Sequence, residues 1–141
     1  MGNQVLNLDT GDKYKGDVVD GKKHGKGRYT FANGNKYEGS YKDDKMNGKG
    51  RFTFKAEGNE YEGDFVDDKM EGKGKFTTKT GCVYVGDFAN NTFNGHGKLT
   101  IKNGPVYEGE FKDGKKNGKG VQTNPDGSKQ EGVWKDDEFQ G

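Results

Sequence analysis

The stretch from Tyr61 to Phe65 reads Tyr-Glu-Gly-Asp-Phe, and Gly72-Lys-Gly74 follows it a short distance later. These two motifs decide the fold, because both recur along the chain at a fixed spacing. The central glycine of the first motif stands at Gly16, Gly39, Gly63, Gly86, Gly109 and Gly132, in steps of 23, 24, 23, 23 and 23 residues. A period of this length predicts a tandem array of small structural units rather than one globular core.

Each motif alternates with the two-residue period that is typical of a β-strand. In the first repeat, Tyr14, Gly16 and Val18 fall on one face of a strand. Lys15 and Asp17 fall on the other face. The second motif alternates in the same way, with glycine and aromatic residues on one face and Lys, Arg and Thr on the other. Each repeat therefore predicts a β-hairpin with one aromatic face and one charged face.

The turn inside the first repeat is Asp20-Gly21, which suits a two-residue type I′ turn. Regular pairing away from this turn places Gly16 opposite Gly25 and Tyr14 opposite Gly27. We therefore expect each tyrosine ring to lie over a glycine, which explains glycine inside a strand, where it costs roughly 0.5–1 kcal/mol. The glycines with this expected structural role are Gly16, Gly25, Gly27, Gly39, Gly48, Gly50, Gly63, Gly72, Gly74, Gly86, Gly95, Gly97, Gly109, Gly118, Gly120 and Gly132.

The connection between repeats must keep the aromatic faces together. A two-residue Asn33-Gly34 turn would pair Tyr29 with Glu38 and join the aromatic face to the charged face. A three-residue loop over 32–34, with Gly34 in the left-handed conformation, pairs Tyr29 with Tyr37 instead. The same rule predicts the pairs Leu6–Tyr14, Phe52–Tyr61, Phe76–Tyr84, Leu99–Tyr107 and, at a polar end of the array, Gln122–Gln130.

The composition is unusual for a folded domain, since 26% of the residues are hydrophobic, 33% are charged and 26 are glycine. Such values normally indicate disorder, but a net charge of only +1 and an aromatic content of 12% oppose it. Lysine and acidic residues are interleaved, which argues against a nucleic-acid-binding protein. The single Cys82 cannot form an internal disulfide, and no signal peptide or membrane-spanning run is present. We therefore expect a cytoplasmic protein that is not secreted.

The succession of Tyr-x-Gly-x-aromatic and Gly-x-Gly-x-apolar motifs resembles the MORN (membrane occupation and recognition nexus) repeat. The resemblance covers nearly the whole chain, and Val18, Gln122, Asn124 and Gln130 are its departures. It implies an all-β fold, an elongated single-layer twisted antiparallel sheet of tandem β-hairpin repeats with a shallow groove. It also implies protein–protein scaffolding at membranes, the cytoskeleton or cilia. In some relatives the repeats precede an enzyme domain, such as a lipid kinase or a lysine methyltransferase.

The repeats divide the chain into one array without a second domain. The expected units are a half repeat over 1–13, full repeats over 14–36, 37–60, 61–83, 84–106 and 107–129, and a half repeat over 130–141.

The aromatic face is the candidate binding surface. A single-layer sheet cannot cover its own apolar face, so one part of that face serves as the core and the remainder forms an exposed apolar strip, which marks a binding surface. We expect a partner's helix or extended peptide to lie along it. The residues predicted to contact the partner are Tyr37, Tyr41, Tyr61, Phe65, Tyr84, Phe88, Tyr107, Phe111 and Trp134.

No catalytic, cofactor-binding or metal-binding residue is predicted. The Gly-Lys-Gly tripeptides lack the spacing and the Ser or Thr of a phosphate-binding loop. His24 and His96 occupy different positions within their repeats, and no acid and nucleophile recur beside them. We therefore expect a protein that is not an enzyme.

The charged face and the ends of the chain leave three alternatives open. The first is a peripheral membrane or phosphoinositide-binding module, which the interleaved acids weaken. The second is a regulatory segment of a larger enzyme, and the third is end-to-end association of copies through their terminal strands. On the charged face itself we expect a solvated ion-pair surface made by Glu38, Glu62 and Glu108 with Lys26, Lys49, Lys73 and Lys119.

Overall fold

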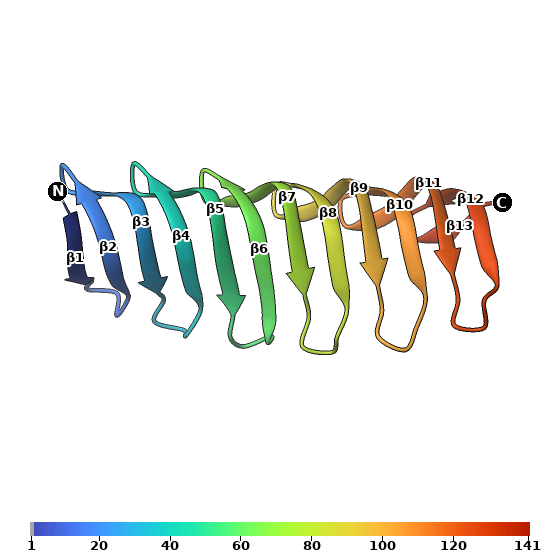
Figure 1. Ribbon diagram of the computed structural model, residues 1–141, viewed down its shortest axis with the longest axis horizontal. Helices are drawn as coiled ribbons and strands as arrows, with labels where there is room; N and C mark the ends of the chain where they lie inside the picture. Colours follow the sequence, from blue (N-terminus) through green and yellow to red (C-terminus); the bar gives the residue numbers. More distant parts are fainter. Residues whose placement is uncertain (1) are drawn as a thin grey trace.

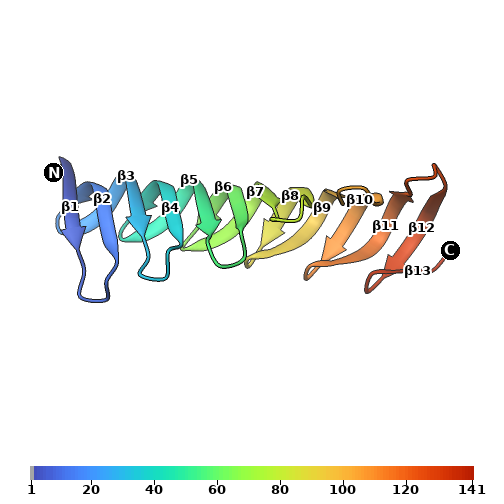
Figure 2. The same ribbon diagram turned by 90° about the horizontal axis from the view of Figure 1, so that it is seen from below.

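The computed structural model describes residues 2–141 as one antiparallel sheet of 13 strands in sequence order, with no helix among them. The two chain ends lie at opposite ends of an elongated array (Figure 1), and the strand direction changes gradually from one end to the other, as expected for a twisted sheet (Figure 2). The predicted fold class is confirmed. The strands are β1 (Gly2–Asn7), β2 (Lys13–Val19), β3 (Lys22–Thr30), β4 (Lys36–Lys42), β5 (Lys45–Phe54), β6 (Asn59–Val66), β7 (Lys69–Thr77), β8 (Val83–Ala89), β9 (Thr92–Thr100), β10 (Val106–Lys112), β11 (Lys115–Thr123), β12 (Lys129–Lys135) and β13 (Glu138–Phe139).

The loops between repeats follow the predicted geometry. The N–H of Phe31 donates to the carbonyl of Asn35 at 2.8 Å, which closes a three-residue loop over 32–34. Gly34 has φ +95°, in the left-handed region. Tyr29 therefore pairs with Tyr37. The other predicted pairs are also present, namely Leu6–Tyr14, Phe52–Tyr61, Phe76–Tyr84, Leu99–Tyr107 and Gln122–Gln130.

The predicted pairing inside each hairpin is wrong. The Asp20-Gly21 turn has positive φ at both residues, 49° and 78°, as a type I′ turn requires. Val18 pairs with Lys23 next to the turn, but a bulge then shifts the register, so that Gly16 faces Gly27 instead of Gly25. The same shift recurs in each later full repeat. Because the shift is an even number of residues, the aromatic and charged faces keep the predicted side chains.

The bulge brings the repeat glycines into one straight row across the sheet. In each full repeat the glycine of the first motif pairs with the second glycine of Gly-x-Gly, and that glycine pairs in turn with the next repeat, from Gly16 to Gly132. Each tyrosine ring leans along its strand and covers this row. A Cβ built on Gly74 would overlap the Cε1, Cζ and Oη atoms of Tyr61. The expectation that tyrosine lies over glycine therefore holds for this position, although the two residues are not direct cross-strand partners.

The first glycine of each Gly-x-Gly has a different role from the predicted one. Gly25 lies at the bulge with φ +106°, a conformation that side chains rarely adopt. A Cβ on Gly25 would lie 2.7 Å from a carboxylate oxygen of Asp17, on the charged face rather than beneath a ring. That carboxylate accepts a hydrogen bond from the N–H of Lys26 at 3.1 Å. Asp64, Asp87 and Glu110 accept the equivalent hydrogen bond in their repeats.

The core of the array is the tyrosine row with the aromatic residue that ends each first motif. Tyr14, Tyr37, Tyr61, Tyr84 and Tyr107 are 0–2% exposed, and each hydroxyl donates to the backbone carbonyl three residues later, at 2.7–2.9 Å. Phe65 packs edge-on against Tyr37 and Tyr61, with centroid distances of 5.0 and 5.1 Å. Tyr41, Phe88 and Phe111 likewise touch a tyrosine of their own repeat and one of the preceding repeat. Trp134 touches only Tyr107 of the preceding repeat, because its own unit has Gln130. These contacts couple neighbouring repeats.

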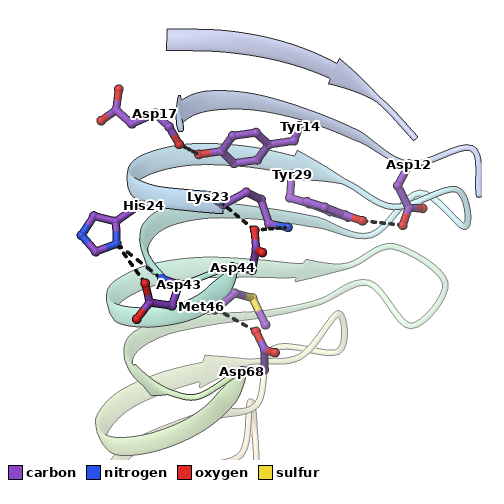
Figure 3. Close-up of polar contacts among 10 residues, drawn as sticks. All are labelled: Asp12, Tyr14, Asp17, Lys23, His24, Tyr29, Asp43, Asp44, Met46 and Asp68. Carbon is purple, nitrogen blue, oxygen red and sulfur yellow. Dashed lines mark hydrogen bonds and ion pairs between the residues drawn. The ribbon is translucent and has the colours of Figure 1, made fainter. Parts of the chain in front are cut away.

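Each hairpin turn from the second repeat onward is hydrogen-bonded to the preceding repeat, and we call the pair of hydrogen bonds made by one turn residue a clasp. Asp44 has φ +70° in its turn, and its carboxylate accepts the N–H of Lys23 at 2.7 Å while its own N–H donates to the Lys23 carbonyl at 2.9 Å (Figure 3). The other clasps join Asp68 to Met46, Asn91 to Met70 and Asp137 to Lys116. Gly114 keeps only the backbone hydrogen bond to Phe93, at 2.9 Å. One clasp therefore lacks its side-chain half.

Replacing Gly74 with alanine tests the tyrosine–glycine contact. Gly74 has no positive φ, so its backbone accepts alanine and the added methyl group acts only by displacing the Tyr61 ring. We expect Gly74→Ala to lower the free energy of unfolding by about 1–3 kcal/mol. Glu62→Gln, on the exposed charged face, should change it by less than about 0.5 kcal/mol. Equal urea midpoints for the two variants would contradict the assignment of faces.

Restoring the missing clasp should stabilise the array. Gly114 has φ +83°, which asparagine tolerates, and a Cβ there meets no atom within 4 Å. We expect Gly114→Asn to raise the free energy of unfolding by about 0.5–1.5 kcal/mol, because its amide oxygen can accept the N–H of Phe93. Gly127→Asn is the matched control, since Gly127 has φ +87° and equally free space but lies in the loop between β11 and β12 rather than at a clasp position. The clasp has no energetic role if both variants shift the thermal midpoint equally.

The buried tyrosines predict loss of stability at alkaline pH. Burial raises the pKa of Tyr37, Tyr61 and Tyr84, and burial together with a hydrogen bond to Asp12 raises the pKa of Tyr29 to about 12. A folded-state pKa above the unfolded value of about 10 gives stability that is complete below pH 10 and is lost as pH rises toward the folded value. Each such tyrosine should remove about 1.4 kcal/mol per pH unit. Urea midpoints between pH 9 and 11.5, with tyrosinate absorbance, measure this. An unchanged midpoint while all seven tyrosines ionise near pH 10 would refute it.

Candidate binding trough

The bulge turns each hairpin end back over the tyrosine row, which hollows the aromatic face. Lys23, just after the first turn, places its ammonium group 5.8 Å from the centre of the Tyr14 ring, 5.3 Å from that of Tyr29 and 5.6 Å from that of Tyr41. Figure 3 shows Lys23 and Asp44 on the same inner side as the Tyr14 and Tyr29 rings, while Asp17 and His24 point away. The aromatic face is therefore the inner surface of a trough rather than a flat strip.

The nine residues predicted to contact a partner form the floor and one wall of this trough, and they are buried. Tyr37, Tyr41, Tyr61, Phe65, Tyr84, Phe88, Tyr107, Phe111 and Trp134 are all 0–5% exposed. The structure brings them together in one cluster, as predicted. Direct binding by these nine residues stays a prediction, but their own packing leaves them almost no surface for a partner in the folded array.

A second set of apolar side chains lies above this core and is partly exposed, except for Met70, which is 8% exposed. Five phenylalanine rings form a row along the array, in the order Phe31, Phe52, Phe54, Phe76 and Phe93. The centroids of neighbouring rings lie 4.6–6.1 Å apart. Met46, Met70 and Phe93 follow the turns and cover the tyrosines from the other side, with Phe93 stacked on Tyr84 at 3.8 Å. The inner surface of the trough is therefore made by Phe31, Met46, Phe52, Phe54, Met70, Phe76 and Phe93, and the nine buried residues lie beneath it.

The trough contains two adjoining hollows. The larger has a volume of about 580 Å³ and is lined by Phe31, Met46, Phe52, Phe54, Phe65, Met70 and Phe76, together with Glu57, Asn59, Asp68 and Asn91. The smaller, of about 250 Å³, shares Met70, Phe76 and Asn91 with it and extends to Phe88, Phe93 and the Gly114 turn. The hollows therefore form one apolar depression over repeats two to four with few polar groups, which is the composition of a ligand site.

Lysine replaces the apolar residue at both ends of the trough. Lys23 and Lys116 occupy the position after the turn that Met46, Met70 and Phe93 hold in the middle repeats. The Lys116 ammonium group lies 4.7 Å from the centre of the Trp134 ring and donates to the Gln122 side chain at 2.8 Å. Burial lowers its pKa. The apolar surface therefore has defined ends.

Sequence reasoning missed the residues after the turns. Regular alternation from the turn does place position 23 on the aromatic face, and Lys23, Met46, Met70, Phe93 and Lys116 recur at the repeat period, so the signal was present. The tyrosine motifs are more conspicuous in the sequence, so the prediction of partner contacts rests on them instead of on these positions.

The outer face carries ion pairs in slightly different partnerships from those expected. Glu38 pairs with Arg28 at 2.7 Å and Glu62 with Arg51 at 3.2 Å, because these residues are direct cross-strand partners. Lys49 pairs with Asp64 and Lys73 with Asp87, and Lys26 donates to the Ser40 hydroxyl at 2.8 Å. Most of these side chains are well exposed, so each pair contributes little to stability.

Chemistry-bearing side chains are scattered. Within residues 2–141, no group of three or more His, Cys, Asp and Glu residues is placed to hold a metal ion. His24 lies 3.8 Å from the Asp43 carboxylate on the outer side of a turn, and Cys82 is partly exposed in a loop. The same part of the chain has no helix long and apolar enough to cross a membrane.

Comparison with solved structures finds a similar fold in the SAS-4 (dCPAP) TCP domain from Drosophila melanogaster, solved in complex with a proline-rich motif of Ana2 (dSTIL). The two chains are 12% identical with a TM-score of 0.48, over 90% of this chain and 81% of the other. The likeness is too distant to carry an argument about function. The comparison with curated proteins finds no matching relative.

Comparison with family models matches the description "MORN repeat" in five consecutive units, over residues 14–36, 37–56, 61–83, 84–106 and 107–129. These matches cover most of the chain, and each full unit holds one tyrosine motif, one bulge and one Gly-x-Gly motif. The protein therefore belongs to the MORN repeat family.

Proposed function

We propose that this protein is a non-catalytic scaffold that holds an apolar segment of a partner protein, a peptide or an amphipathic helix, in the trough. We place it in the cytoplasm, in a cytoskeletal, ciliary or membrane-associated assembly. MORN repeats suggest binding of protein or membrane in general. The choice of a protein partner depends on the trough of this chain.

The observation that carries the proposal is the apolar depression over repeats two to four. Its larger hollow, about 580 Å³, is lined by five phenylalanines and by Met46 and Met70 beneath a polar rim. An unfilled apolar surface bounded by polar residues is typical of a protein-binding site. Methionine side chains are flexible, so they can adapt to the apolar side chains of a partner.

The buried core supports the same proposal indirectly. The hydroxyls of the five tyrosines in the buried row donate to backbone carbonyls, and the edge-on ring contacts run through successive repeats. The trough is therefore built on a rigid base. A preformed surface loses little conformational entropy on binding, which favours affinity.

The outer face gives weaker support to the membrane alternative. Its lysines and arginines are interleaved with acids and pair with them, as in Arg28–Glu38 and Lys73–Asp87. The net charge of the chain is +1. Attraction to an anionic membrane needs clustered basic residues, each contributing about 1 kcal/mol near the surface.

Selection from a displayed library of random 20-residue peptides tests the proposal. The trough variant combines Phe54→Thr and Phe76→Gln, residues that the chain itself carries at the equivalent positions 78 and 122, so the fold should persist. The control combines Lys75→Gln and Lys98→Gln on the exposed charged face. We expect selected peptides to lose at least about tenfold in affinity for the trough variant and less than twofold for the control.

Two outcomes would contradict the proposal. One is that the selected peptides bind both variants as tightly as they bind the unchanged protein, or that the selection yields no binding peptide. The other is sedimentation of the protein with phosphatidylserine vesicles that the charged-face control reduces and the trough variant does not. The second result would place the membrane-binding alternative first. Thermal unfolding of each variant confirms that the fold is intact.

A further inference from the structure

We propose that the occupant of the trough is an amphipathic α-helix that lies along the array with its C-terminal end at β11, where a carboxylate of its last turn pairs with Lys116. This inference rests on the proposed function and adds the conformation, direction and one charge of the partner.

The pairing of the sheet favours a helix over an extended peptide. Every strand from β2 to β12 has a hydrogen-bonded neighbour on both sides. The trough floor is made of side chains and offers no free strand edge to an incoming peptide. An extended peptide would lie in an apolar depression with unpaired N–H and C=O groups, which is costly. A helix satisfies these groups internally and presents only its apolar stripe to the trough.

The lysines at the trough ends set the length of the apolar contact. The uninterrupted run of apolar residues after the turns begins with Met46 in β5 and ends with Phe93 in β9, and Lys116 in β11 separates it from Phe139 in β13. Six strand spacings separate β5 from β11, which is about 29 Å at ~4.8 Å per strand. A helix of about 19 residues spans this distance at ~1.5 Å per residue.

The two end lysines differ in their charge partners. The Lys23 ammonium group lies 3.6 Å from the carboxylate of Asp44, which neutralises it. Among residues 2–141, no carboxylate lies within ion-pair distance of the Lys116 ammonium group, whose hydrogen-bond partner is the neutral Gln122 side chain. Lys116 is also partly buried against Trp134. The Asp137 carboxylate, which accepts the Lys116 backbone N–H at 2.8 Å, acts on this ammonium group only from beyond ion-pair distance. A cation without a direct ion pair favours an incoming carboxylate more strongly than Lys23 does.

The polarity of the trough also gives the direction of the helix. Glu57 and Asp68 line the larger hollow near the β5 end, whereas Lys116 stands at the β11 end. The N-terminus of a helix carries partial positive charge and its C-terminus partial negative charge. A helix that runs from β5 toward β11 therefore places each end beside a group of opposite charge, and the reverse orientation places each end beside a group of like charge.

Peptides that bind in a trough-dependent manner in the display selection provide the test. We expect them to carry apolar residues at the i, i+3, i+4 and i+7 spacing and an acidic residue within the last turn, and to become helical by circular dichroism when bound. A spin label at the peptide C-terminus should broaden the amide signals of β11 rather than those of β3. Selected peptides with two-residue alternation, or broadening at β3, would overturn the inference while leaving the proposed function intact.

A double-mutant cycle isolates the charge pair. Lys116→Met introduces the residue that the chain carries at 46 and 70, so folding should be unaffected. It should weaken binding about tenfold at low salt, and changing the peptide's acidic residue to Gln should do the same. In the Lys116→Met background, the peptide change should cost less than twofold. Lys23→Met should cost less than threefold. Additive losses, or equal losses at the two lysines, would overturn the assignment of Lys116. Loss of all trough-dependent binding to the unchanged protein would instead count against the proposed function.

Discussion

The packing of one tyrosine ring over one glycine is the contact on which the rest of this structure depends. The ring can lie flat against the sheet only where the strand below has no side chain, and its hydroxyl then reaches the carbonyl three residues along its own strand. That carbonyl belongs to the residue at the bulge, so ring, glycine and bulge require one another. Because the aromatic residue that ends each first motif packs between the tyrosines of two repeats, the local contact becomes a continuous core in a sheet that has no second layer.

The bulge gives the aromatic face its hollow shape. A regular hairpin would carry its turn straight past the sheet edge, whereas the bulged hairpin turns back and brings Met46, Met70 and Phe93 over the tyrosines. The rings that dominate the sequence are thereby removed from solvent. The apolar residues left partly exposed are Met46 and the less conspicuous phenylalanines of the second strands, and together with the buried Met70 they line the apolar hollows. The buried set stabilises the fold, and the proposed binding is assigned to the other set of apolar side chains.

Departures from the repeat carry information because the repeated framework holds everything else constant. Gly114 lacks the side chain with which Asp44, Asp68, Asn91 and Asp137 clasp the preceding repeat. Lys23 and Lys116 replace apolar residues at the two ends of the trough. Of these two, in the described part of the chain, only the Lys23 ammonium group lies within ion-pair distance of a carboxylate. A perfectly regular array would give the proposed helix neither register nor direction. The unequal ends give this one a defined length and polarity.

The sequence by itself determined the all-β class, the order of the strands, the faces of each strand and the register between repeats, because these follow from the period of 23 residues, the two-residue alternation and the loop length. Only the tertiary structure decided the register inside each hairpin. The bulge there is set by the reach of the Tyr14 hydroxyl and by the Asp17 carboxylate, which are three-dimensional fits that alternation does not encode. The same bulge decided which aromatic residues are buried. The candidate site could therefore be assigned to the correct face from sequence, but its exposed residues emerged only from the packing.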